Sequence, residues 1–128
     1  MKPRNRTYKI PIDVYGAEMT VVLSSNPDKV KDRLCGGDGK KESIVNPVTL
    51  NCWFVYDRPD SKSYYLIFPF KPDADSISHE CFHLVSKLLY TSGSKLNQST
   101  EEQYAYLLGH IVGVVTDKIQ RYNKRRKA

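Results

Sequence analysis

The sequence has too few cysteines, too widely spaced, for a disulfide framework. Its 128 residues include three cysteines, Cys35, Cys52 and Cys81, and no C-x-x-C pair. An odd number of isolated cysteines argues against both a disulfide scaffold and a cysteine-based zinc knuckle. We therefore expect reduced thiols with structural roles, and we expect Cys81 to face the core.

The sequence also lacks a long apolar run. No segment approaches the ~20 apolar residues that a membrane-spanning helix needs. The basic stretch Met1–Arg6 is followed by an alternating polar pattern instead of the apolar segment of a signal peptide. Hydrophobic residues make up 40% of the chain and charged residues 27%, as in ordinary globular proteins. We predict one domain, residues 1–128, located in the cytoplasm and without a membrane span.

The middle of the chain has no excess of positive charge. Nine of the 20 Lys and Arg residues lie in two basic tails, 1–9 and 121–128, and the other 11 face 14 acidic residues. Basic tails can bind nucleic acid through its phosphates. A solvated helix end, whose cations suit the C-terminal helix dipole, explains the same pattern. Nucleic acid is thus one candidate partner.

The N-terminal half has the alternating pattern of β-strands. Thr7–Leu23 reads as two strands, with turn residues at Tyr15–Glu18 between them. Val48–Tyr56 and Tyr64–Phe70 are rich in β-branched and aromatic residues and are separated by a turn-forming segment. Two hairpins of this kind predict a mainly antiparallel sheet of four strands.

The C-terminal half has the periodicity of two long helices. The first is expected to begin at an N-cap, Asp75 or Ser76, and to run to about Tyr90, with Gly93 as its stop signal. The second is expected over Ser99–Tyr122. Apolar residues recur along both segments at helical spacing.

A short helix over Pro27–Leu34 is expected between the two strand pairs, because capping residues and a proline precede it. The glycine-rich stretch Cys35–Lys41 lacks the phosphate-loop pattern and is predicted to be a loop. The predicted fold class is α+β, a small and mainly antiparallel sheet followed by two long packed helices.

The motif His79-Glu80-Cys81-Phe82-His83 lies in the first long helix. Residues four apart share one helix face, so His79 and His83 can offer two imidazole nitrogens to one metal ion. Glu80 lies about 100° round the helix, where it can reach a metal-bound water. This H-E-x-x-H pattern is typical of zinc-dependent hydrolases, in which the Glu acts as general base.

The helical wheel places the two histidines away from the apolar stripe, on the side that also carries Ser86 and Tyr90. On this reading, Glu80 also lies off the stripe, so the three polar residues would line a cleft. A satisfied core or plain surface histidine is the alternative. The stripe consists of Ile77, Cys81, Leu84, Val85, Leu88 and Leu89.

A catalytic zinc usually has three protein ligands, and Glu102 is the predicted third. On the last helix, Glu102, Ala105, Gly109 and Gly113 share one face with Tyr106. Glycine inside a helix costs about 0.8–1.0 kcal/mol relative to alanine, so a face of small residues predicts close approach of another backbone. The first long helix is the expected neighbour, which would bring Glu102 to the histidine pair.

Other roles remain open for several residues. Glu102 also fits a capping box with Ser99, in which case Glu101 is the alternative ligand. His110 lies about 12 Å along the axis from Glu102 and is not expected to share its metal. Tyr106 is a candidate for the second shell of the metal or for an oxyanion donor, with plain packing as the alternative.

The segment from Ser76 to Gly113 resembles the gluzincins, the thermolysin-like class of zinc peptidases. The resemblance rests on His79-Glu80-x-x-His83, followed after eighteen residues by Glu102-x-x-Ala105. The chain is also similar to very small phage- or prophage-encoded metallopeptidases that end in a comparable helix. The resemblance to gluzincins implies a zincin-like site, in which His79, His83 and Glu102 bind zinc and Glu80 is the general base. The 128 residues leave little room for the large C-terminal subdomain of bigger gluzincins.

Two functions follow as hypotheses. The first is a zinc-dependent metallopeptidase that hydrolyses a peptide or protein substrate. The second is a non-catalytic zinc-binding module that binds nucleic acid or a protein partner through its basic ends.

Overall fold

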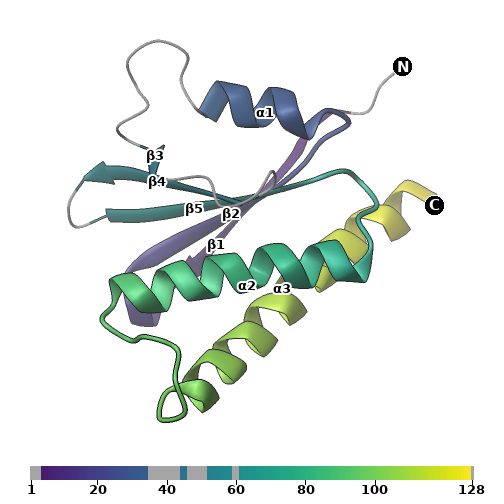
Figure 1. Ribbon diagram of the computed structural model, residues 1–128. Coiled ribbons are helices and arrows are strands. Elements are labelled where there is room, and N and C mark those ends of the chain that lie inside the picture. The colour runs from purple at the N-terminus through teal and green to yellow at the C-terminus, as the bar shows by residue number, and fades with distance from the viewer. Residues whose placement is uncertain (1–3, 35–43, 46–51, 59–60, 128) are drawn as a thin grey trace. The chain divides into compact units, whose positions relative to one another are not determined.

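The structure is a computed structural model that describes residues 4–34, 44–45, 52–58 and 61–127. The chain divides into two compact units, Met1–Lys71 and Pro72–Ala128, and each is described by itself. The first contains the strands and the second contains the two long helices (Figure 1). The glycine-rich segment that was predicted to be a loop, Cys35–Lys41, lies outside the described residues.

The first unit is a five-stranded sheet in the order β1-β2-β5-β4-β3. Only the β2–β5 pair is parallel, and the other three pairs are antiparallel. The predicted α+β class with a mainly antiparallel sheet is therefore confirmed, although a two-residue fifth strand was not foreseen. The strands are β1 (Arg6–Ile12), β2 (Ala17–Leu23), β3 (Ile44–Val45), β4 (Cys52–Arg58) and β5 (Ser61–Phe68).

The β1–β2 connection is tighter than a simple turn. A 3-10 turn, η1 (Asp13–Tyr15), ends at Gly16, whose φ of 61° is left-handed. Glycine adopts this conformation without a steric penalty. Strand β2 begins at Ala17, inside the segment Tyr15–Glu18 that was predicted to form the turn. Its register with β1 then runs without interruption from Ala17 opposite Ile12 to Leu23 opposite Arg6.

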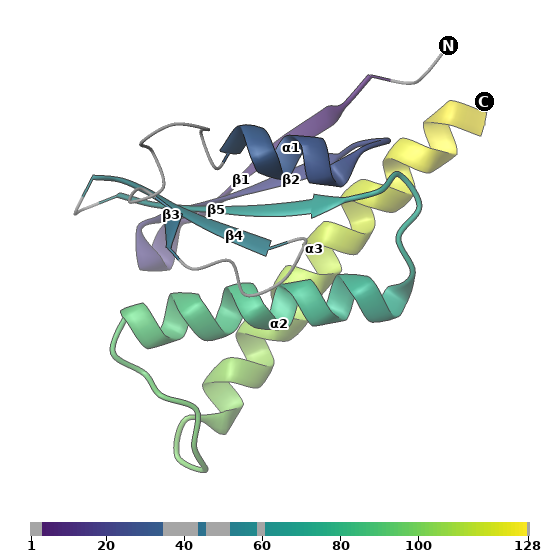
Figure 2. The same cartoon turned by 45° about the horizontal axis from the view of Figure 1, so that its top comes forward.

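Helix α1 (Pro27–Leu34) has the predicted bounds and lies across one face of the sheet (Figures 1 and 2). Asn26 accepts a hydrogen bond from the backbone N–H of Lys29 at 3.2 Å, as an N-cap does. On the sheet, Val22 and Ile67 form a buried cluster against which Val30 packs. The helix therefore covers an apolar patch shared by β2 and β5.

The second unit consists of α2 (Ala74–Thr91) and α3 (Glu101–Lys127), which contact each other and run in opposite directions (Figures 1 and 2). The predicted N-cap, Asp75 or Ser76, is wrong by two or three residues: the N-cap is Asp73, whose carboxylate accepts a 2.8 Å bond from the backbone N–H of Ser76. Gly93 follows its end with a φ of 93°, as the stop signal predicted. No helix in the described part of the chain is long and apolar enough to cross a membrane.

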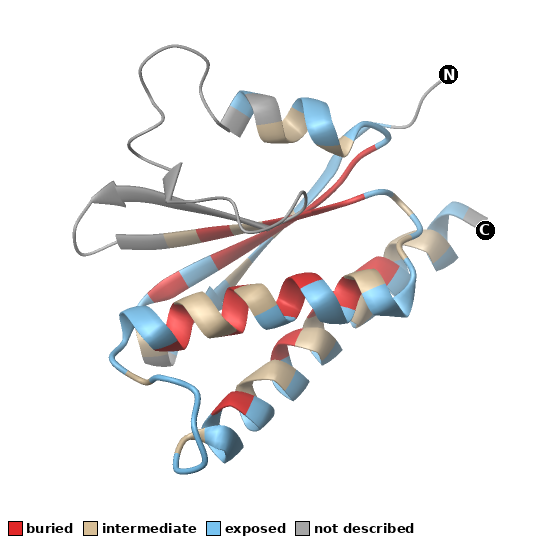
Figure 3. Ribbon diagram, viewed as in Figure 1, coloured by how far each residue is buried: buried red, intermediate tan, exposed pale blue. Residues whose placement is uncertain are grey.

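Burial follows the helical period on both helices (Figure 3). On α3, the buried positions recur every four or seven residues and form one face. The buried residues of α3 are Tyr104, Ile111, Val115 and Ile119. On α2 they are the six predicted apolar residues, Ile77, Cys81, Leu84, Val85, Leu88 and Leu89, together with Glu80.

Candidate metal centre

The two histidines of the motif lie side by side on α2. The Nε2 atoms of His79 and His83 are 3.2 Å apart, and the two rings meet edge to face with centroids 4.7 Å apart. His79 is exposed and His83 is partly buried. The helix therefore presents two nitrogens of the same kind at one point of its surface, as the i, i+4 spacing predicted.

This separation suits a shared metal ion. Zinc binds histidine nitrogen at about 2.0–2.1 Å, and two tetrahedral ligands at that distance lie about 3.3–3.4 Å apart. The observed 3.2 Å is within about 0.2 Å of that spacing. The imidazoles thus fit two corners of a zinc site with their present rotamers.

The local electrostatics favour the metal-binding form of His83. Partial burial lowers the pKa of His83, and the neighbouring His79 and Lys87 lower it further, while the Glu80 carboxylate acts in the opposite direction. Only the neutral imidazole has a ring nitrogen with a free lone pair, and a metal ion binds through that lone pair. A lowered pKa therefore reduces competition between protons and metal near neutral pH.

Glu80 does not lie where the helical wheel had placed it. The prediction that it stands off the apolar stripe is wrong, because Glu80 is 5% exposed and belongs to the buried side of α2. Ile77 and Leu84, which lie one turn before and after it, are buried on the same side. The His pair and the carboxylate therefore occupy adjacent faces, one open to solvent and one closed.

Cys81 is a structural residue, as expected. Its side chain is fully buried, and it is a free thiol. Burial raises the pKa of Cys81 to about 12, and the nearby Glu80 carboxylate adds to the effect. The thiol is therefore protonated at neutral pH and is not available as a thiolate ligand.

The predicted third ligand is not brought to the pair. Within the ranges that the structure describes, no group of three or more His, Cys, Asp or Glu side chains could hold one metal ion. Glu102 and the alternative Glu101 are both exposed in the first turn of α3. The structure thus unites His79 and His83, and Glu102 as a ligand stays a prediction.

The packing argument for Glu102 is wrong. The face with Ala105, Gly109 and Gly113 is exposed, and a Cβ added at either glycine would meet nothing within 4 Å. Within the second unit as described, these small residues therefore make no close backbone contact. Helix α3 instead buries the face of Tyr104 and Ile111.

The two remaining candidates also lie on exposed parts of α3. Tyr106 is 76% exposed, and His110, one turn further on, is exposed as well. The predicted second-shell or oxyanion role of Tyr106 remains a prediction. Its exposure gives no sign of the alternative, a packing role.

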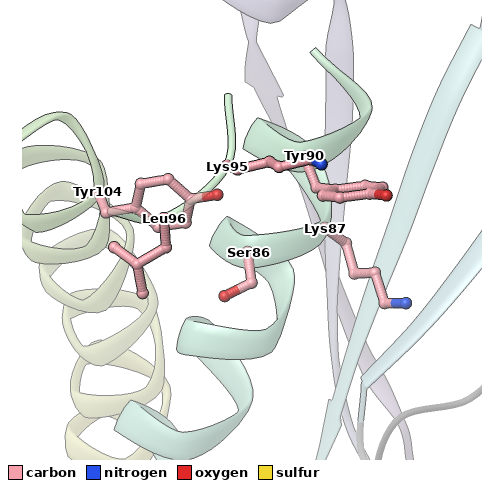
Figure 4. Close-up of a pocket in the computed structure, with 6 residues that line it drawn as sticks. All are labelled: Ser86, Lys87, Tyr90, Lys95, Leu96 and Tyr104. Atoms are coloured by element: carbon pink, nitrogen blue, oxygen red, sulfur yellow. The ribbon is translucent and has the colours of Figure 1, made fainter. Parts of the chain in front are cut away.

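A pocket beside the motif was not recognised from the sequence as a binding site. It has a volume of about 440 Å³ and lies between α2, the 92–100 loop and the start of α3 (Figure 4). The placement of Ser86 and Tyr90 on the histidine side of the helix was the available signal. The residues that line the pocket are Ser86, Lys87, Tyr90, Lys95, Leu96 and Tyr104.

Comparisons of the chain with protein-family models, with curated proteins and with solved structures gave no match. The resemblance to gluzincins therefore rests on the motif and its spacing.

Proposed function

We propose that the protein is a zinc-dependent metallopeptidase that hydrolyses peptide bonds. The observation that carries the proposal is the 3.2 Å separation of the His79 and His83 Nε2 atoms on the open face of α2. A pair of surface histidines at ligand spacing, with a glutamate between them, is the arrangement that H-E-x-x-H hydrolases use. Glu102 enters as the third ligand from its spacing in the sequence.

The roles of the chain's own residues follow from their chemistry. A zinc ion at this pair would polarise the scissile carbonyl and acidify a bound water. His79 and His83 would hold the metal through their Nε2 atoms. Glu80 would accept the proton of the attacking water and pass it to the leaving amine. Because Glu80 lies on the buried side of α2, this role requires its carboxylate to turn towards the face that carries the histidines. Its position next to His79 in the chain keeps the carboxylate within one helical turn of both ligands.

Elemental analysis of the purified protein tests the metal claim. We expect one zinc per chain, lost in His83→Ala and retained in His110→Ala, the matched control for removal of an exposed histidine. Glu102→Ala should lower zinc affinity, and Glu101→Ala should not. A metal-free wild-type protein that takes up no added zinc would refute the proposal.

Glu80→Gln tests the chemistry separately from the metal. It keeps the side-chain shape and removes the base, so hydrolysis of a mixed peptide library should fall by about 10²–10⁴-fold. Zinc content should stay at the wild-type value. Activity that survives this substitution would show that Glu80 is not the base.

The second candidate function is a non-catalytic zinc module that binds nucleic acid. The supporting observation is the end of α3, where four basic side chains are exposed along its last two turns. Arg121 is paired with Asp117 at 3.0 Å, and Arg126 stacks over the Tyr122 ring. The four are Arg121, Lys124, Arg125 and Arg126.

A salt titration of binding to duplex DNA tests this candidate. Each phosphate contact contributes about −0.9 to the slope of log affinity against log salt. Replacing Lys124, Arg125 and Arg126 by Gln should reduce the slope by about 3 if all three bind phosphates. A wild-type protein that does not bind DNA at low salt would remove nucleic acid from its partners.

A further inference from the structure

The pocket at the C-terminal end of α2 combines apolar walls with two cations. The rings of Tyr90 and Tyr104 and the side chain of Leu96 supply the apolar surface, and Lys87 and Lys95 supply positive charge. Among the residues that the structure describes, none that lines the pocket is acidic. Tyr90 and Leu96 are 61% and 52% exposed, an unusual degree for large apolar side chains that flank one hollow. Figure 4 shows Lys95 extending towards Tyr90, and Lys87 on the side of α2 away from Leu96 and Tyr104.

The loop that forms one wall is held by hydrogen bonds, so the pocket is preformed. The Tyr104 hydroxyl donates to the Ser94 carbonyl at 2.5 Å, and the Ser94 N–H donates to the Leu89 carbonyl at 2.8 Å. The Thr100 hydroxyl donates to the Lys95 carbonyl. The Asn97 N–H donates to the Thr100 hydroxyl at 3.0 Å, so the backbone is held on both sides of Lys95 and Leu96. A ligand therefore meets a built surface and does not have to order the loop first.

The chemistry of the lining selects the occupant. At about 440 Å³ the hollow is within the range of small-ligand sites and can hold one amino-acid side chain with part of its backbone. The ammonium groups of Lys87 and Lys95 in the lining favour an anion, and the apolar walls favour a carbon skeleton. A carboxylate on a short aliphatic chain, as in glutamate, satisfies both conditions.

The pocket continues the face of α2 that carries the histidine pair. Ser86 and Tyr90 lie three and seven residues beyond His83, within about 60° of His79 on the helical wheel. Lys87 and Tyr90 are displaced from His83 by about 6 and 10 Å along the axis at 1.5 Å per residue. An extended peptide covers this distance in two or three residues at about 3.3 Å each. One peptide laid along α2 can therefore reach both places.

We propose that this pocket is a substrate subsite that binds the carboxylate of an acidic residue two or three positions from the peptide bond that is cut. The reference to a bond that is cut rests on the proposed function. Binding of the carboxylate itself depends only on the pocket.

The test measures peptide binding without turnover. The probes are blocked alanine-rich octapeptides with a single Glu, at positions two or three residues to either side of the centre, and the same peptides with Gln. Binding is followed by NMR titration, first with metal-free protein in chelator and then with zinc and the Glu80→Gln protein. We expect at least one Glu peptide to bind about tenfold more tightly than its Gln partner, a difference of about 1.4 kcal/mol.

Charge-removing variants locate the binding. The double substitution Lys87→Gln and Lys95→Gln should abolish the preference for Glu over Gln, and Leu96→Ala should weaken both peptides equally. Lys29→Gln, an exposed lysine of α1, is the matched control and should leave the preference intact. Circular dichroism checks that the variants fold, and substitutions of lysine by glutamine at the surface should not disturb folding.

The outcomes separate the pocket from the proposed function. A missing Glu preference in the wild type, or one that survives the double substitution, overturns the pocket assignment even if the protein binds zinc and cleaves peptides. A preference that depends on Lys87 and Lys95 supports it. If the same protein binds no zinc and cleaves nothing, the peptidase proposal fails while carboxylate binding stands.

Discussion

Alanine at Gly109 and Gly113 distinguishes two orientations of α3. In the structure both glycines are exposed, and an added Cβ meets nothing within 4 Å. Both lie in the interior of a 27-residue helix. Alanine is favoured over glycine at such positions by about 0.8–1.0 kcal/mol each. The double substitution should therefore stabilise the protein by about 1.6–2 kcal/mol, since the two methyl groups do not compete for space.

If α3 had the opposite orientation, the two alanine substitutions would destabilise the protein. If the small-residue face packed closely against another backbone, as the sequence suggested, the added methyl groups would clash and destabilise by about 1–3 kcal/mol. Glu102 shares that face, so the result bears on whether its carboxylate points towards the neighbouring helix. A net destabilisation by Gly109→Ala and Gly113→Ala would refute the orientation of α3 described above.

Thermal unfolding followed by circular dichroism at 222 nm is a suitable assay. A gain of 2 kcal/mol in a chain of this length raises Tm by about 6–10 °C. Gly16→Ala is the matched control, because that position also has open space but a φ of 61°. A left-handed backbone costs a non-glycine residue about 1–2 kcal/mol, so this variant should be less stable than wild type. Space and backbone conformation are thereby tested separately.

Three other predictions concern α2. Leu88 is fully buried, so Leu88→Ala should lower the free energy of unfolding in urea by about 2–5 kcal/mol, whereas Leu96→Ala, at an exposed position, should change it by less than about 0.5 kcal/mol. The hydrogen bond from the Ser76 N–H lowers the pKa of Asp73 from 3.8. The cap therefore stabilises the protein above pH 3.8, and its contribution is lost as the pH falls below that value. Asp73→Ala should make the free energy of unfolding depend less on pH in this acid range. Burial lowers the pKa of His83 from 6.5, so its protonation should weaken zinc binding at a lower pH than protonation of an unshifted histidine would. NMR titration of the metal-free protein measures this pKa, and a value above 6.5 would contradict the prediction.

Local sequence patterns were sufficient to predict most of the helices and strands, and to predict that His79 and His83 meet. Helix α1 and the stop at Gly93 follow from proline, capping residues and glycine, whose preferences act over a few neighbouring residues. The meeting of His79 and His83 is equally local, because four residues make about one helical turn in any surroundings. The α+β order of elements needs only the change of apolar period from two to 3.6.

Contacts between distant segments decided the rest. The parallel pairing of β2 with β5 joins residues some 45 positions apart in the sequence, and no turn signal specifies it. A helical wheel gives the angles between Glu80 and its neighbours. The width of the buried stripe, however, depends on what packs against it, and Glu80 lies inside the buried stripe of α2.

The orientation of α3 also depends on contacts between segments that are distant in the sequence. Its sequence offers two faces for close packing, one with small residues and one with Tyr104, Ile111, Val115 and Ile119. The larger apolar face is buried because it removes more apolar surface from water. The sequence alone therefore determined which residues share each face of the two helices. Only the tertiary structure decided which faces are closed and where a pocket remains open.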